Sequence, residues 1–380
     1  MRINIVTGPW LPVPPLQGGS TGRIWQGLAE SFATQGHQVK ILCRSYPGQP
    51  NHEIRNKVTY IRRGGLPQST NIYLDLVKDF AYGLTTFPTL PSADILIIND
   101  FWLPFFASVF RPDAGKIVIH AGRFPKGQYR LGLYAGVTRF VALSRVIQEG
   151  ISQEDPAAIP RMRIIPNPID TSIFSPPTSP QVHREEKTIL YVGRVHPEKG
   201  IHLLIDAFKI LVEKIPQVRL KIVGPFKGTQ GGGGEEYFRI LKTKAEGLPI
   251  DFLDAIFDPY KLADTYRSAD LFCYPSLAEK GEAFPVAPLE AMATGLVPVV
   301  SNLACFEDYI QEGIDGYFFD HRSDRAVENL AETFTAAITD WEKTLEIGLN
   351  VAQKAQNYSY EKIANIYLDD FAQLLNNIKV

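Results

Sequence analysis

The stretch TILYVGRVHPEKGIHLLIDAFKILVEK, residues 188–214, decides the fold. It joins a short apolar run, a turn with a glycine at each end, and a segment whose apolar residues recur at helical spacing. Strand, turn and helix in this order form the unit from which parallel sheets are built. In the turn, Arg194 and Lys199 lie between Gly193 and Gly200. Free amides and the helix dipole already favour an anion there, so two added cations predict a diphosphate site. A solvated surface turn is the alternative.

The same pattern extends through the chain and predicts two α/β domains. The 380 residues are 45% apolar and 21% charged, as in soluble globular proteins. Apolar runs alternate with amphipathic segments both before and after the Pro- and Ser-rich stretch that follows Pro166. We therefore expect two doubly wound domains facing across a cleft, because ligands of such sheets bind beyond the carboxyl ends of the strands. The expected boundaries are 1–166 for the first domain, 167–187 for the linker and 188–357 for the second domain. A terminal helix over about 358–380 joins the first.

Charge and cysteine content restrict the partners and the compartment. Residues 1–160 carry 16 Lys and Arg against 10 Asp and Glu, while the remainder carries 23 against 31. The basic half favours an anionic partner or peripheral contact with a membrane, and an ordinary solvated surface is the alternative. The three cysteines, Cys43, Cys273 and Cys305, form no CxxC pair, which indicates a reducing, cytoplasmic compartment. No apolar run is long enough to span a membrane, and we expect no nucleic-acid partner.

A second group of polar residues lies in EAFPVAPLEAMATG, residues 282–295. The stretch follows a predicted strand and places Glu282 before a helix and Glu290 in one of its early turns. An ionised carboxylate accepts hydrogen bonds, which two adjacent sugar hydroxyls can donate. Glutamate near the start of a helix also favours the helix itself, and that reading stays open for each residue taken alone.

Together these segments resemble the retaining glycosyltransferases of family 4, the glycosyl transferases group 1. These enzymes have the GT-B fold of two Rossmann-like domains and use a nucleotide-activated sugar. The stretches that carry the resemblance span residues 163–319: RIIPNPIDTSIFSP, ILYVGRVHPEKGIHLLIDAF, LKIVG, YRSADLFCYPSLAEKGEAFPVAPLEAMATGLVPVV and EGIDGYFF.

The resemblance implies roles for the second domain. Arg194 and Lys199 would hold the donor pyrophosphate, Glu290 the nucleotide ribose and Glu282 the transferred sugar. The donor pocket would also include Gly193 and Phe284. One departure concerns the sugar end of the pocket. The family usually has Glu-Gly-Phe-Gly where this chain has Glu-Ala-Phe-Pro, and Pro285 has no N–H to offer a ligand.

The first domain matches the family more loosely. The segment GGSTGRIWQGLAESFATQGHQV resembles the family's first glycine-rich loop and helix, so Gly18 and Gly19 would bring backbone amides to the phosphates. The segment KIVIHAG places His120 where the family often has an active-site histidine. RFPKGQYRLGLY, residues 123–134, is basic and aromatic, which suits an acceptor that is a small molecule, a glycan or lipid-linked. An ordinary surface segment is the alternative.

The expected reaction is transfer of a sugar from a nucleoside-diphosphate sugar to an acceptor hydroxyl, with retention of configuration. No Asp-x-Asp motif occurs, so we expect no metal and no cofactor besides the donor, with Arg194, Lys199 and the helix end stabilising the leaving group. TQGGGGEE, residues 229–236, lacks the ending of a P-loop and is interpreted as a flexible loop. Rival functions are a sugar-nucleotide epimerase, a glycoside phosphorylase of the same fold, and a catalytically silent sugar-nucleotide-binding protein.

Overall fold

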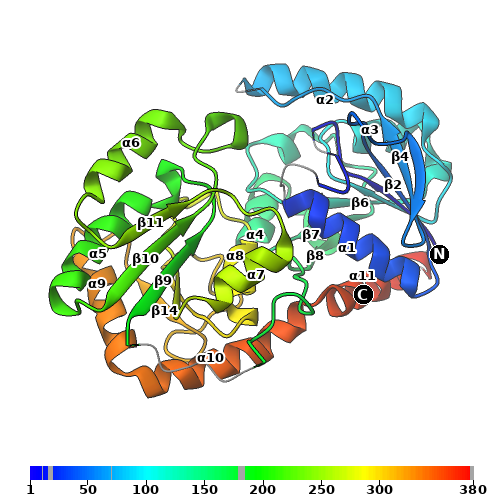
Figure 1. The fold of residues 1–380 in the computed structure, drawn as a ribbon. Coiled ribbons are helices and arrows are strands. Elements are labelled where there is room, and N and C mark those ends of the chain that lie inside the picture. The colour runs from blue at the N-terminus through cyan, green and yellow to red at the C-terminus, as the bar shows by residue number, and fades with distance from the viewer. Residues whose placement is uncertain (11, 16–19, 70, 179–184, 377–380) are drawn as a thin grey trace. The chain divides into compact units, whose positions relative to one another are not determined.

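The computed structural model describes residues 1–10, 12–15, 20–69, 71–178 and 185–376. These residues form two compact α/β units, which consist of Met1–Pro168 with Ser359–Val380, and of Ile169–Tyr358 (Figure 1). Of the expected linker, residues 179–184 lie outside the described residues.

The sheet of unit 1 has the strand order β3-β4-β2-β1-β5-β6-β7-β8. All neighbouring strands are parallel except β3 and β4, which form an antiparallel pair. Asn56 and Lys57, both at positive φ, make the turn of this hairpin, which the sequence analysis did not predict. The strands are β1 (Arg2–Val6), β2 (Gln38–Arg44), β3 (His52–Arg55), β4 (Val58–Arg63), β5 (Ile95–Ile98), β6 (Lys116–Ala121), β7 (Arg139–Ala142) and β8 (Met162–Ile164).

Helices of unit 1 come from both ends of the chain. The C-terminal helix α11 packs against α1, where the rings of Tyr367 and Phe371 meet that of Phe32. Arg139 and Asp370 add a buried ion pair of 2.9 Å between β7 and α11. The helices are α1 (Ser20–Thr34), α2 (Ile72–Thr86), α3 (Leu103–Phe110), α4 (Arg145–Glu154) and α11 (Tyr360–Leu375).

The sheet of unit 2 is parallel and has the order β11-β10-β9-β12-β13-β14. Since β9 and β12 are neighbours, the loops that follow them leave the same edge of the sheet. The strands are β9 (Lys187–Val192), β10 (Val218–Val223), β11 (Ile250–Leu253), β12 (Leu271–Tyr274), β13 (Val297–Ser301) and β14 (Tyr317–Phe319). The helices are α5 (Ile201–Lys214), α6 (Gly234–Lys244), α7 (Pro259–Arg267), α8 (Val286–Ala293), α9 (Ala326–Thr339) and α10 (Trp341–Ala355).

Candidate active site

The turn between β9 and α5 packs tightly against the loop that follows β12. Gly200 has a φ of +67°, and a side chain there would collide with the carbonyl oxygen of Pro275. The amide of Leu277 donates to the carbonyl oxygen of Glu198 at 2.8 Å, which ties the two loops together. Only glycine combines this backbone conformation with so close an approach. The second glycine of the motif therefore fixes where its charged residues lie.

Lys199 and Glu282 form a buried ion pair between these two loops. Their side chains are 6% and 7% exposed, and the Lys199 ammonium donates to Oε1 of Glu282. Ser276 Oγ donates to the same carboxylate oxygen at 2.7 Å. The ammonium also lies 5.5 Å from the centroid of the Tyr274 ring. Burying two charges costs several kcal/mol of solvation free energy each. Stability alone is therefore a weak reason for this arrangement.

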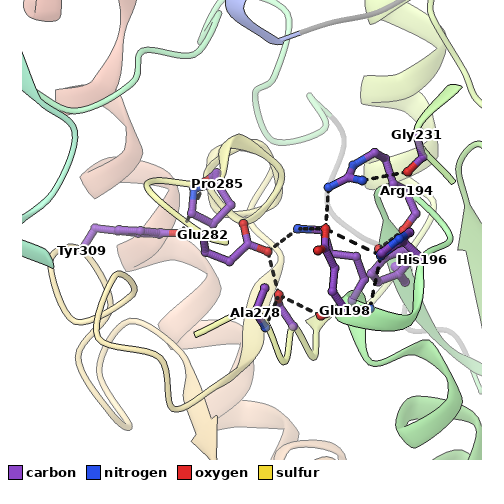
Figure 2. Close-up of polar contacts among 11 residues, drawn as sticks. Arg194, His196, Glu198, Gly231, Ala278, Glu282, Pro285 and Tyr309 are labelled. Carbon is purple, nitrogen blue, oxygen red and sulfur yellow. Dashed lines mark hydrogen bonds and ion pairs between the residues drawn. The ribbon is translucent and has the colours of Figure 1, made fainter. Parts of the chain in front are cut away.

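Arg194 lies on the exposed side of the turn and makes two defined contacts. Figure 2 shows its guanidinium donating to the carbonyl oxygen of Gly231 at 2.7 Å and to Oε1 of Glu198 at 2.6 Å. The Lys199 ammonium is 4.0 Å from the same Glu198 oxygen. Burial opposes ionisation of Glu198, but the charges of Lys199 and Arg194 hold its pKa below the ordinary value. Both predicted cations are thus paired with carboxylates.

The glycine-rich segment, residues 229–236, contacts the turn between β9 and α5. Besides the Arg194 bond to Gly231, the amide of Gly233 donates to the carbonyl oxygen of Val195 at 2.8 Å. Gly193, at the other end of the turn, lies so close to Tyr191 that a Cβ would come within 2.7 Å of the phenol oxygen. That phenol donates to the carbonyl oxygen of Arg194 at 2.9 Å. The segment interpreted as a flexible loop thus contacts the turn directly.

Phe284 lies just before α8 and Glu290 lies within it, and both residues are buried. Glu290 lies in the second turn of the helix and accepts a hydrogen bond of 3.1 Å from the Tyr266 phenol of α7. The Phe284 ring lies 4.7 Å, between ring centroids, from the Tyr309 ring and is tilted against it by 48°, and the Tyr309 hydroxyl donates to the carbonyl oxygen of Pro285 at 3.5 Å. Pro285 directly precedes the helix. Phe284 is therefore engaged in aromatic packing, while Glu290 presents a carboxylate held by a phenol.

His120 lies in β6 of unit 1. Its ring meets the Trp25 ring edge-on at 5.1 Å, and the Trp25 indole donates to Asn99 Oδ1 at 2.8 Å. Burial lowers the pKa of His120 to about 4, so the imidazole is neutral near pH 7. Gly18 and Gly19 lie outside the described residues.

Several residues around the predicted ones were missed by the sequence analysis. Glu198 is inside the motif but was not assigned a role, and its partners Arg194 and Lys199 give the signal that could have found it. Ser276 and Tyr266 reach the site from other elements, and their spacing in the sequence gives no such signal. Among the described residues, no group of three or more His, Cys, Asp or Glu side chains is placed to hold a metal ion, and no helix is long and apolar enough to cross a membrane.

Known proteins of similar sequence identify the family. The family model "Glycosyl transferases group 1" matches residues 177–354. The phosphatidyl-myo-inositol mannosyltransferase of Mycobacterium tuberculosis is 34% identical over 346 residues, which cover 83% of this chain and 82% of that protein. The chain belongs to the group 1 glycosyl transferases. It is thus a glycosyltransferase, and the predicted family and enzyme class are confirmed.

Solved structures of similar fold cover almost all of this glycosyltransferase. The sucrose-phosphate synthase of Thermosynechococcus elongatus matches with a TM-score of 0.75 at 20% identity and covers 99% of both chains. HepE of Anabaena, in complex with UDP and glucose, matches with a TM-score of 0.73 at 18% identity, covering 98% of this chain and 100% of that one. The predicted GT-B fold with two parallel-sheet domains is confirmed.

Proposed function

We propose that this glycosyltransferase moves a sugar from a nucleoside-diphosphate sugar to an acceptor hydroxyl, with retention of configuration and without a metal. The observation that carries the proposal is the buried Lys199–Glu282 pair, which places a cation and a carboxylate where the loops after β9 and β12 meet. Two similar structures support the class of donor. HepE was solved with UDP and glucose, and the trehalose-6-phosphate enzyme of E. coli with UDP-2-fluoro glucose.

In this proposal, the turn after β9 binds the diphosphate. Negative charge develops on the departing phosphate as the bond to the sugar breaks, and groups already aimed at that charge lower the barrier. Arg194 and Lys199 supply cations, and the first-turn amides of α5 supply free N–H donors. The phosphate then competes with Glu198 for both cations, while Lys199 keeps its ion pair with Glu282. This charge stabilisation takes the place of a metal ion.

The two glutamates bind the hydroxyl groups of the donor. Glu290, held by Tyr266, accepts hydrogen bonds from the nucleotide ribose, and Glu282 accepts from the transferred sugar. Since Glu282 is paired with Lys199, one residue of this ion pair binds the sugar and the other binds the phosphate. Acceptor recognition is assigned to unit 1, where His120 is neutral near pH 7 and positions a hydroxyl without adding charge.

A panel of sugar nucleotides tests this proposal. The cognate donor, at 100 times its dissociation constant, stabilises the protein by about 2.7 kcal/mol, which appears as a rise in the unfolding temperature. With that donor, the enzyme should release nucleoside diphosphate, keep its activity in EDTA, and give a product whose anomeric configuration by NMR matches the donor. A requirement for inorganic phosphate would indicate a phosphorylase, and conversion of the donor alone an epimerase. Binding without turnover on any acceptor would indicate a silent binding protein.

We also propose that unit 1 contacts a lipid bilayer through α2, which buries polar residues and exposes apolar ones. Its two aspartates, Asp75 and Asp79, are buried, whereas Tyr73 and Val77 are 77% and 65% exposed. Four of the exposed apolar residues follow helical spacing and lie on one face: Tyr73, Val77, Phe80 and Leu84. Val109 and Phe110, at the end of α3, which packs beside α2 (Figure 1), are also exposed.

The charges of α2 favour a lipid surface as the occupant. Both aspartates are buried, and Asp75 lies 3.5 Å from the Lys78 ammonium, so no α2 carboxylate repels anionic headgroups. The M. tuberculosis relative is named for a phospholipid acceptor, phosphatidyl-myo-inositol. An acceptor of that kind has to be reached at a membrane.

Vesicle flotation tests the membrane contact. The wild type should float with phosphatidylcholine vesicles that contain anionic phosphatidylglycerol, and the double variant Tyr73→Glu, Val77→Glu should remain below. Leu349→Glu, which alters a 74% exposed leucine of unit 2, is the matched control and should float like the wild type. If the wild type does not float but sediments as a dimer that the α2 variant abolishes, the face binds a second copy and the proposal fails.

A further inference from the structure

Two carboxylates balance the two cations of the proposed diphosphate site. Arg194 is paired with Glu198, and Lys199 is paired with Glu282 and lies 4.0 Å from Glu198. The four formal charges of this group therefore cancel. A site that binds an anion is expected to carry an excess of positive charge. The diphosphate is thus bound well only if one of the two carboxylates gives way to it.

Glu198 is the carboxylate that can give way. Its side chain is 36% exposed, whereas that of Glu282 is almost fully buried. Oε1 of Glu282 accepts hydrogen bonds from both Lys199 and Ser276. Among the described residues, the Glu198 carboxylate accepts one hydrogen bond, from Arg194 at 2.6 Å. Water can hydrate Glu198 once it leaves Arg194, whereas moving Glu282 would leave a buried charge unpaired.

The other contacts of the turn keep Arg194 in place when Glu198 departs. The Arg194 guanidinium also donates to the carbonyl oxygen of Gly231, and this contact with a neutral group does not depend on Glu198. His196 Nδ1 lies 3.8 Å from Oε1 of Glu198 but accepts the Glu198 amide at 3.3 Å, so it donates nothing to the carboxylate (Figure 2). The Glu198 carboxylate thus stays charged near pH 7 and repels a phosphate that approaches the same cations.

The product of the proposed reaction carries more negative charge than the donor. When the bond between the anomeric carbon and the diphosphate oxygen breaks, both of its electrons stay on that oxygen. The sugar forms its new bond with the acceptor oxygen, whose proton leaves. The nucleoside diphosphate therefore gains one negative charge at a pH above about 6, the second pKa of a phosphate group. Two unopposed cations would hold this product more tightly than the donor.

We propose that Glu198 is a built-in competitor of the diphosphate, which returns to Arg194 after the transfer and so promotes release of the nucleoside diphosphate. It lowers the affinity for the product more than the affinity for the donor, because the product carries more charge. This inference rests on the proposed function and concerns the same site. Glu198 is a positioning residue, since it acts on the cations and does not touch the reacting atoms.

Isothermal titration with UDP, GDP and ADP tests the competition. The nucleotide that binds the wild type most tightly should bind Glu198→Gln at least about threefold more tightly, the effect of one exposed ion pair. Surface plasmon resonance should show slower dissociation from this variant. Glu198→Asp, which keeps the charge, should lie closer to the wild type. The matched control is Glu213→Gln, which removes the same charge from the last turn of α5, at the far end of that helix, and should bind like the wild type.

Product inhibition separates release from a purely structural role. In Glu198→Gln, the inhibition constant of the nucleoside diphosphate should fall by a larger factor than the KM of the donor. Equal falls would show that Glu198 opposes both ligands alike, and its assignment to product release would be wrong. The unfolding temperature should hardly change, because the pair with Arg194 is exposed. If Glu198→Gln fails to fold, Glu198 is structural and the inference is wrong.

The titration also separates failure of this inference from failure of the proposed function. An unchanged or weaker affinity in folded Glu198→Gln, with clear binding by the wild type, would overturn the inference and leave the proposed function standing. Binding by Glu198→Gln alone would support the inference, because Glu198 then excludes the nucleotide. If neither protein binds any of the three nucleotides, the proposed function fails and the inference fails with it.

Discussion

Lys199 and Glu282 are 83 positions apart in the sequence and form an ion pair that is almost fully buried in unit 2. The pair joins the turn after β9 to the loop after β12, and Ser276 donates a further hydrogen bond to the carboxylate. Because burying two charges costs free energy, removing one of the two should measurably change the free energy of unfolding.

A double-mutant cycle measures the coupling energy between Lys199 and Glu282. Lys199→Met leaves the Glu282 carboxylate buried without its cation and should lower the free energy of unfolding by about 3 kcal/mol. In Lys199→Met, Glu282→Gln, where neither residue is charged, most of that loss should be regained, while activity stays well below that of the wild type. Urea unfolding of the four proteins gives the coupling energy. A double variant no more stable than Lys199→Met would show that the two residues are not coupled.

Arg194→Lys should lower kcat/KM for the donor about tenfold, with less effect on stability than Lys199→Met. A lysine has one ammonium and cannot reproduce the planar guanidinium that contacts both Gly231 and Glu198. Exposed ion pairs contribute little to folding, so urea unfolding should hardly change. The control is Arg325→Lys, which alters an exposed pair with Glu332 on α9. Equal activities of the two variants would remove Arg194 from the site.

The loop that carries Glu282 is fastened by Glu279, and loosening it should slow the enzyme. Glu279 accepts hydrogen bonds from Arg322 at 2.8 Å and contacts His321 Nε2 at 2.9 Å. Glu279→Gln removes the charge and should lower kcat by a few-fold, about the effect of losing one exposed ion pair. Steady-state kinetics measures this change, with Glu332→Gln as the control for loss of an exposed glutamate. A kcat equal to that of the control would show that the loop holds its position without this contact.

His120 should remain neutral down to about pH 4 in the folded protein. Because the unfolded chain binds a proton at a higher pH, near the ordinary value of 6.5, the unfolded state is favoured progressively as the pH falls from 6.5 to 4. His120→Asn should therefore lose less stability than the wild type over this interval. NMR of the imidazole resonances, assigned by comparison with that variant, reports the pKa directly. A midpoint near 6.5 would contradict the burial argument.

Local patterns were sufficient to predict most strands of both sheets and the turn with its two cations. The helix α2 was not predicted, because it buries Asp75 and Asp79 and exposes its apolar residues, which is the reverse of the usual pattern. The strand β3 was missed because it is short and mostly exposed. Contacts between distant segments, such as those of Glu282 with Lys199 and Ser276, depend on which strands are neighbours in the sheet. Spacing in the sequence does not determine the order of the strands.

The central claim is that Lys199, with Arg194, binds the diphosphate of the donor. Isothermal titration with the nucleoside diphosphate of the cognate donor tests it most directly, comparing the wild type, Lys199→Ala and Lys244→Ala, whose lysine pairs with Asp206 on the surface of unit 2. Lys199→Ala should bind at least about thirtyfold more weakly and turn over correspondingly more slowly, and Lys244→Ala should match the wild type. Wild-type affinity in a folded Lys199→Ala variant would contradict the account.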